Sequence, residues 1–116
     1  MLVGVFRAGF PRVQLRVEGQ AVEFIVDTGF RGEITLPARL ATRLDAPVVG
    51  TRVVQLADGT SRIAPVHLLS VEWESELRLV ETLALEGNPL LGTELLEGYH
   101  VHAEISEGGE VFVEAL

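Results

Sequence analysis

Short apolar or alternating runs, broken by Gly, Pro and Asp, recur along the whole sequence, and this punctuation constrains the fold more than any other feature. Residues 12–17 alternate Arg or Gln with Val or Leu, which is the pattern of a half-buried strand. The turn at 18–20 leads into the apolar run 21–26, so these two runs are expected to form a β-hairpin. A chain built from such units is mainly β.

A second hairpin is expected in the middle of the chain. Residues 51–56 and 60–69 read as its strands, and they flank Asp58-Gly59. An Asp-Gly pair favours a tight turn because both central residues can adopt positive φ. Pro65 has no N–H to donate, so it places the returning strand at an edge of the sheet or ends it.

The C-terminal half continues the β pattern. Residues 71–77 alternate strictly, with apolar residues including Leu77 on one face and three glutamates on the other. They are expected to form one strand that packs its apolar face and exposes its acidic face to solvent. Residues 101–116 are expected to form a closing hairpin around Gly108-Gly109.

Helical signals are confined to two short segments. Pro37 can open a helix that reaches Leu44, since proline suits a first helical turn. A single turn of helix is expected from Thr93 to Leu96, with Thr93 as its N-cap and Gly98 ending it.

Composition limits the class of protein. The chain has 116 residues, 47% of them hydrophobic, so residues 1–116 are expected to form one domain with one core. Cysteine is absent, which excludes disulfides and thiolate metal sites. The apolar residues 1–6 are followed at once by Arg7, and no apolar run approaches the roughly 20 residues of a membrane helix. We therefore expect a soluble, cytoplasmic protein.

The charge balance argues against polyanionic partners. Seventeen acidic residues against nine arginines, with no lysine, give a net charge of −8. An acidic surface repels phosphate backbones and anionic lipid, and no basic stripe offsets it. Neither nucleic acid nor a membrane is an expected partner.

Three short segments could carry chemistry. The first is Asp27-Thr28-Gly29 directly after an apolar run, which by itself suits a turn as well as half of an active site. The second is the polar-tipped hairpin 55–60, either a plain connection or a mobile lid. The third is residues 88–98, where two leucines and a glycine lead into the short helix.

The order and spacing of these segments resemble the retropepsin-like aspartic proteases, especially the small single-domain microbial forms. In that family an apolar run ending in Asp-Thr-Gly comes early, a β-hairpin flap follows, and an apolar-apolar-Gly element precedes a C-terminal helix. The resemblance implies a mainly-β acid-protease barrel, one lobe per chain with one or two short helices. It also implies a homodimer in which Asp27 of each subunit acts on one water, without a cofactor, to hydrolyse peptide bonds of a peptide or protein substrate.

The resemblance also implies roles for the other matching residues. Thr28 would hydrogen-bond across the dimer, and Gly29 would allow the tight turn while leaving its backbone open to substrate. The flap tip would consist of Ala57, Asp58 and Gly59. Leu91 and Gly92 would support the catalytic loop from below.

The chain departs from retroviral members at two places. Phe30 and Arg31 stand where those proteins have a small and then an acidic residue, and Gly92 is followed by Thr93-Glu94 rather than Arg-Asn or Arg-Asp. The arginine–aspartate network of the retroviral dimer therefore cannot be copied. An ion pair between Arg31 and Glu94 is a hypothesis for its replacement.

Several alternatives stay open. His100 and His102 share one face of a strand, but two ligands without a third make a metal site weak, and none is predicted. No serine has the Gly-x-Ser-x-Gly context of a serine hydrolase. A retropepsin-fold dimerisation or peptide-binding module with weak or no turnover is the main alternative function. A plain β-barrel with Asp27 as a turn residue would be a monomer.

Overall fold

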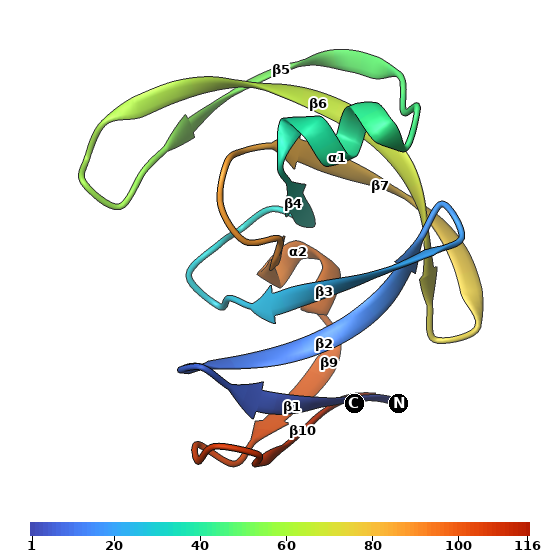
Figure 1. Ribbon diagram of the computed structural model, residues 1–116, viewed down its shortest axis with the longest axis vertical. Helices are drawn as coiled ribbons and strands as arrows, with labels where there is room; N and C mark the ends of the chain where they lie inside the picture. The colour runs from blue at the N-terminus through green and yellow to red at the C-terminus, as the bar shows by residue number, and fades with distance from the viewer.

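Ten strands and two short helices make up the computed structural model, which describes residues 1–116 (Figure 1). The strands are β1 (Leu2–Arg7), β2 (Phe10–Val17), β3 (Gln20–Val26), β4 (Ile34–Leu36), β5 (Val48–Gln55), β6 (Ser61–Trp73), β7 (Glu76–Ala84), β8 (Leu90–Leu91), β9 (Tyr99–Ala103) and β10 (Glu110–Ala115). The helices are α1 (Ala38–Arg43) and α2 (Thr93–Leu96), and neither has the length needed to cross a membrane. The mainly-β prediction is confirmed.

All ten strands join one sheet in the order β5-β6-β7-β4-β8-β3-β2-β1-β10-β9. An additional pairing of Val17 with Val71 ties β2 to β6, so the sheet curls back on itself. The predicted hairpins β2–β3, β5–β6 and β9–β10 are all present. Pro65 lies in the part of β6 that pairs with β5 but not with β7, because the pairing with β7 begins at Val66. One side of the strand is therefore unpaired at Pro65, as expected.

Short parallel pairings bring distant segments together in the middle of the sheet. β8 lies between β3 and β4, with Val26 opposite Leu91 and Ile34 also opposite Leu91. β4 pairs in parallel with β7 on its other side. Because β3 and β8 run in the same direction, their carboxyl ends lie side by side, and the loops that follow them meet.

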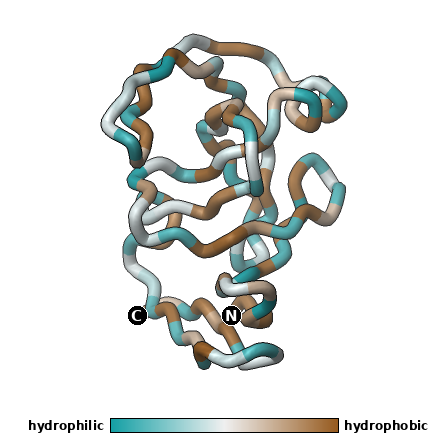
Figure 2. Tube along the Cα trace, turned by 60° about the vertical axis from the view of Figure 1, so that its left-hand side comes forward, coloured by the Kyte–Doolittle hydropathy of each residue, from teal (hydrophilic) through white to brown (hydrophobic).

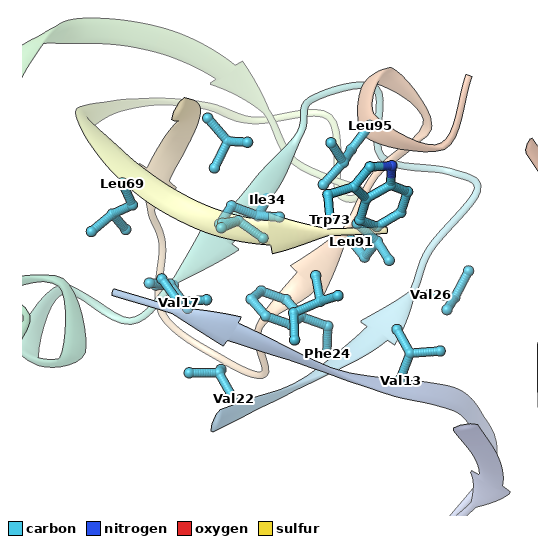
Figure 3. Close-up of a cluster of buried hydrophobic side chains, with 14 of the residues drawn as sticks. Val13, Val17, Val22, Phe24, Val26, Ile34, Leu69, Trp73, Leu91 and Leu95 are labelled. Carbon is cyan, nitrogen blue, oxygen red and sulfur yellow. The ribbon is translucent and has the colours of Figure 1, made fainter. Parts of the chain in front are cut away.

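The core lies inside the curled sheet and contains the apolar face of almost every strand (Figure 3). Trp73 is fully buried, and its ring packs edge to face against that of Tyr99, with ring centroids 5.2 Å apart. Phe24, Ile34 and Leu91 pack in the same cluster. Each such side chain contributes roughly 1.5–3 kcal/mol by leaving water. Figure 2 shows apolar and polar residues alternating in short bands along the strands, as a half-buried sheet requires.

The prediction of one strand over residues 71–77 is wrong. β6 ends at Trp73, and Glu74-Ser75 form a two-residue turn, with φ of 51° and 73°, that leads into β7. The turn reverses the chain, so Leu77 is 74% exposed instead of packing beside Trp73. The sequence does not indicate this turn, because two-residue turns with positive φ at both positions usually contain Asn or Gly there.

Two local predictions need correction. At the β5–β6 turn only Gly59 has positive φ (86°), because the loop has three residues, Ala57 to Gly59, and the glycine closes it. At α2 the N-cap is Gly92, and Thr93 is the first helical residue, without a side-chain cap bond. The helix from Pro37 to Leu44 is confirmed, with Pro37 at the N-cap.

Candidate active site

Asp27 is the first residue after β3, and backbone contacts fix its position. Its N–H donates to the carbonyl of Leu91 at 2.9 Å, which extends the β3–β8 pairing by one residue. Its Oδ1 accepts a hydrogen bond from the N–H of Gly29 at 2.9 Å, the bond of an Asx turn. The side chain is half-buried at the point where the loop leaves the sheet.

The loop after Asp27 is held from below by the start of α2. The N–H of Gly92 donates to the carbonyl of Glu33 at 2.9 Å, and the N–H of Thr93 donates to that of Phe30 at 2.8 Å. The Thr93 hydroxyl donates to the same Phe30 carbonyl at 3.3 Å. Leu91 and Gly92 thus lie directly against the loop that carries Asp27, and their role in supporting it stays a prediction.

Gly92 is a point of close backbone approach. A Cβ placed there would lie 2.1 Å from the Gly32 carbonyl oxygen and 2.6 Å from the Phe30 ring. The ring also covers Gly32 and packs against a small cluster of Ala64, Val66 and Leu83. Phe30, which departs from the retroviral pattern, therefore fills the space between the loop and the β6–β7 part of the sheet.

An open cavity of about 1260 Å³ begins at this loop. Its lining combines the loop residues 28–32 with residues 52–55 of β5 and with Tyr99 and Val101 of β9. Asp27 lines a smaller neighbouring hollow of about 320 Å³, together with Phe10 and Asn88. The carboxylate therefore lies on the border between two concave surfaces.

The sequence did not predict that residues of β5 and β9 line this cavity. Residues 52–54 were expected only as part of a strand and Val101 only as part of the closing hairpin, and no role was predicted for Tyr99, yet all of them line the cavity. Val53 and Val54 are both apolar, so the sequence does not show which of them faces inward; in the structure Val54 packs beside Ala64, whereas Val53 is 68% exposed. Nothing in the sequence indicates that Tyr99 and Val101 reach the same cavity, because this depends on the long-range course of β9.

The β5–β6 hairpin extends above the loop that follows β3 (Figure 1). Its tip is ordered by local bonds: the N–H of Gly59 donates to the carbonyl of Leu56 at 3.0 Å, and Asp58 Oδ1 accepts from the N–H of Thr60 at 2.9 Å and from its hydroxyl at 2.6 Å. The predicted tip residues Ala57, Asp58 and Gly59 do not line the cavity, whereas the strand leading to them does.

The sequence of residues 13–95 matches a family model described as aspartyl protease. The match spans more than half of the chain and includes Asp27, the hairpin and Gly92. The chain belongs to the aspartyl protease family. No curated protein matches the sequence of this chain significantly.

Solved structures show that the family member has a retropepsin-like fold. A retropepsin-like aspartic protease from Rickettsia conorii matches with a TM-score of 0.66 and 22% identity, covering 100% of this chain and 92% of the other. The EIAV protease complexed with the inhibitor HBY-793 matches with a TM-score of 0.67 and 13% identity over 78% of this chain and 88% of the other. The retroviral protease-like domain of Ddi1 from Leishmania major matches with a TM-score of 0.54 and 15% identity, covering 95% and 96%.

Arg31 and Glu94 of this aspartyl protease family member both line the cavity, but they form no ion pair within the chain. The two side chains therefore do not pair within one chain, and an Arg31–Glu94 pair between two subunits stays a prediction. Beside them, Arg52 pairs with Glu81, and Glu33 Oε1 accepts from the N–H of Glu81 at 3.0 Å.

The histidines are explained by packing. His67 is buried, with Nδ1 3.1 Å from the carbonyl of Ala46. His102 stacks on Phe112 with ring centroids 4.5 Å apart, and the ring centroid of His100 lies 6.4 Å from that of the same Phe112. No group of three His, Asp or Glu side chains is placed to hold a metal ion.

The tip of the β5–β6 hairpin gives a first prediction. The hydroxyl and N–H of Thr60 both donate to the Asp58 carboxylate and hold its pKa below its usual range. Thr60→Val removes the hydroxyl, which is the larger cause, so the pKa of Asp58 is expected to rise toward its ordinary value. NMR titration of the Asp58 carboxyl carbon measures this, with Ser61→Ala as the matched control. An unchanged pKa in the valine variant would contradict these tip contacts.

Proposed function

We propose that this protein is an aspartic endopeptidase that works as a homodimer and hydrolyses peptide bonds through a water held between the Asp27 carboxylates of two subunits. The observation that carries the proposal is the setting of Asp27. It stands at the end of β3, fixed by Leu91 and Gly29, beside a large open cavity beneath the β5–β6 hairpin, in a chain of the aspartyl protease family.

The proposal of a second chain rests on the single Asp-Thr-Gly segment of the sequence. Amide hydrolysis by this route requires one carboxylate to accept a proton from water while the other donates a proton to the carbonyl oxygen. Of the other two aspartates, Asp45 follows α1 and Asp58 lies at the hairpin tip, and neither lines the hollow that contains Asp27; Glu86 lines it, but it does not belong to a second Asp-Thr-Gly. A second copy supplies the missing carboxylate when a two-fold axis passes beside Asp27.

Thr28 supports the same arrangement. It is exposed, its hydroxyl has no hydrogen-bond partner within the chain, and it lines the cavity next to Asp27. In the proposed dimer this hydroxyl bonds to the partner subunit and holds the two loops together. The backbone of Gly29 is also accessible: a Cβ at this position would have one neighbouring atom within 4 Å, the Asp27 Oδ1 at 3.2 Å.

The proposed substrate is an extended peptide between the loop and the β5–β6 hairpin. The hairpin acts as the flap, with Ala57, Asp58 and Gly59 at its tip and residues 52–55 facing the bound chain. Closing the flap excludes water from the reacting carbonyl. Leu91 and Gly92 keep the catalytic loop in place through their backbone contacts. The cytoplasm stays the predicted location.

Cleavage of a diverse peptide library tests the proposal, with the protein at concentrations that favour a dimer. We expect specific cleavage between mildly acidic and neutral pH. If a protein shown to be dimeric cleaves nothing, the peptide-binding module without turnover becomes the better account. Cleavage by a strict monomer would contradict the shared site.

The dependence of the rate on pH is a second prediction. Two neighbouring carboxylates hold a single proton between them over a mildly acidic range, a behaviour well known for aspartic-protease dyads. The rate should therefore pass through a maximum on the acid side of neutrality and fall when the shared proton is lost at higher pH. Initial rates on one cleaved peptide measure this. A rate that continues to climb well into alkaline pH would contradict a carboxylate pair.

A further inference from the structure

The smaller hollow beside Asp27 contains side chains that the proposed mechanism does not use. Besides Asp27, its lining includes the apolar residues Phe10, Ile25 and Leu90 and the polar residues Glu86 and Asn88. Its volume of about 320 Å³ lies at the low end of the range for binding pockets, which leaves room for one long side chain. Because Asp27 is part of the lining, a side chain that enters the hollow belongs to a residue next to the peptide bond that is cleaved.

Strand pairing explains why the apolar residues share one face of the sheet with Asp27. Ile25 and Asp27 are two residues apart on an extended chain, so their side chains point to the same face. Leu90 lies opposite Ile25 in the parallel β3–β8 pair. In the β2–β3 hairpin Arg12 lies opposite Ile25, and the same register continued by two residues sets Phe10 opposite Asp27. The hollow therefore combines apolar walls with the carboxylate that is proposed to be catalytic.

Glu86 lies on the connection from β7 to β8, and this connection is fixed at both ends. At its start the N–H of Leu85 donates to the carbonyl of Leu36 at 3.0 Å. At its end the carbonyl of Pro89 accepts the N–H of Ile25 at 2.9 Å. The backbone that carries Glu86 is therefore held against the sheet on both sides of this residue.

The carboxylate of Glu86 has no cationic partner within the chain. Glu86 is exposed, and it takes part in none of the ion pairs of the structure. The guanidinium carbon of Arg12 lies 5.8 Å from the centroid of the Phe10 ring, but Arg12 already pairs with Glu23 and donates to the carbonyl of Arg7. Glu86 therefore keeps an uncompensated negative charge at the hollow.

The surroundings of Glu86 in the sequence are acidic as well. Residues 79–116 contain no arginine or lysine and many glutamates, of which only Glu81 is ion-paired within the chain. The large cavity differs from the hollow, because Arg31 and Arg52 contribute to its lining, whereas no arginine lines the hollow. A cationic group is therefore attracted to the hollow and meets no like charge in its lining.

We propose that Glu86 determines specificity, and that the hollow takes the side chain of a lysine or arginine next to the peptide bond that is cleaved. The inference rests on the proposed function and names its class of substrate, peptides with a basic residue at the cleavage site. The methylene groups of such a side chain pack against the apolar walls, and its cationic end pairs with the carboxylate of Glu86. An acidic side chain at the same position is repelled by Glu86.

Peptides that differ only in Lys, Leu or Glu next to one cleaved bond test the inference. Because a two-fold axis repeats the hollow, the residue on each side of the bond is varied in turn. The wild-type protein should cleave the Lys peptide with the highest kcat/KM. Glu86→Gln removes the charge and keeps the size, so the ratio of kcat/KM for the Lys peptide over the Leu peptide should fall about two- to fivefold, as for an exposed ion pair. Glu86→Arg should lower the ratio of Lys over Glu about tenfold or more.

Asp45→Asn is the matched control for the change in charge. It removes the same charge at a position after α1 that lines neither concave surface, so its ratios should equal those of the wild type. Added salt gives an independent readout, because it screens the pair between Glu86 and the basic residue of the substrate. The preference for Lys should weaken with salt in the wild type and change little in Glu86→Gln.

The outcomes separate this inference from the proposed function. A protein that cleaves peptides without a preference for Lys, or keeps that preference in Glu86→Arg, overturns the role of Glu86 and leaves the proposed function standing. A dimeric protein that cleaves no peptide of a diverse library overturns both. The emission of buried Trp73 checks that each variant is folded.

Discussion

Replacing Asp27 by Asn is expected to abolish peptide cleavage while the fold and the dimer persist. Asn retains the oxygen that accepts the N–H of Gly29, so the Asx turn can form. The amide cannot take the proton from water or return one to the carbonyl oxygen, and general acid–base catalysis of this kind contributes about 10²–10⁴-fold. We expect kcat/KM to fall by about 10³-fold or more.

The chain offers a close control for this substitution. Asp45 lies just after α1, outside the loop that carries Asp27. Its φ is 56°, a conformation that Asn also tolerates. Asp45→Asn should therefore cleave at the wild-type rate. Cleavage that survives Asp27→Asn would point to another catalyst in the sample and remove the role assigned to Asp27.

Gly92→Ala is expected to cause a large loss of stability. The new methyl group would lie 2.1 Å from the Gly32 carbonyl oxygen and 2.7 Å from that of Phe30, and backbone cannot yield as a flexible side chain can. Separating α2 from the loop also breaks the bonds between Gly92 and Glu33 and between Thr93 and Phe30. We expect a loss of about 3 kcal/mol or more in the free energy of unfolding.

Denaturant unfolding followed by the emission of the single tryptophan, Trp73, measures this loss. Gly50→Ala is the matched control, because a Cβ at Gly50 meets nothing within 4 Å and its φ is not positive. That variant should unfold within about 0.5 kcal/mol of wild type. Equal stability of the two alanine variants would contradict the close contact between α2 and the loop.

Local patterns predicted most of the elements. The β2–β3 hairpin follows from alternation on either side of Glu18-Gly19, and α1 follows from Pro37 and the spacing of its leucines. The setting of Asp27 was also predictable, because an apolar run that ends in Asp-Thr-Gly leaves the carboxylate at the end of a strand. Each of these depends on neighbours in the sequence.

Features that depend on distant parts of the chain, or on unusual turn residues, were not predicted. Glu74 and Ser75 both take positive φ without being Gly or Asn, so the end of β6 was missed. The contact of Phe30 with Gly92 requires the parallel pairing of β3 with β8. The hollow that contains both Asp27 and Glu86 likewise depends on this pairing.

Activity in mixtures of wild-type and Asp27→Asn chains, at constant total concentration and after subunit exchange, tests most directly whether two subunits share one active site. If both Asp27 carboxylates are required, only wild-type pairs are active, and cleavage follows the square of the wild-type fraction. An equal mixture then retains about one quarter of the wild-type rate, which is the result we predict. A rate of about one half, falling in proportion to the wild-type fraction, would mean that each chain acts alone and would contradict the shared site.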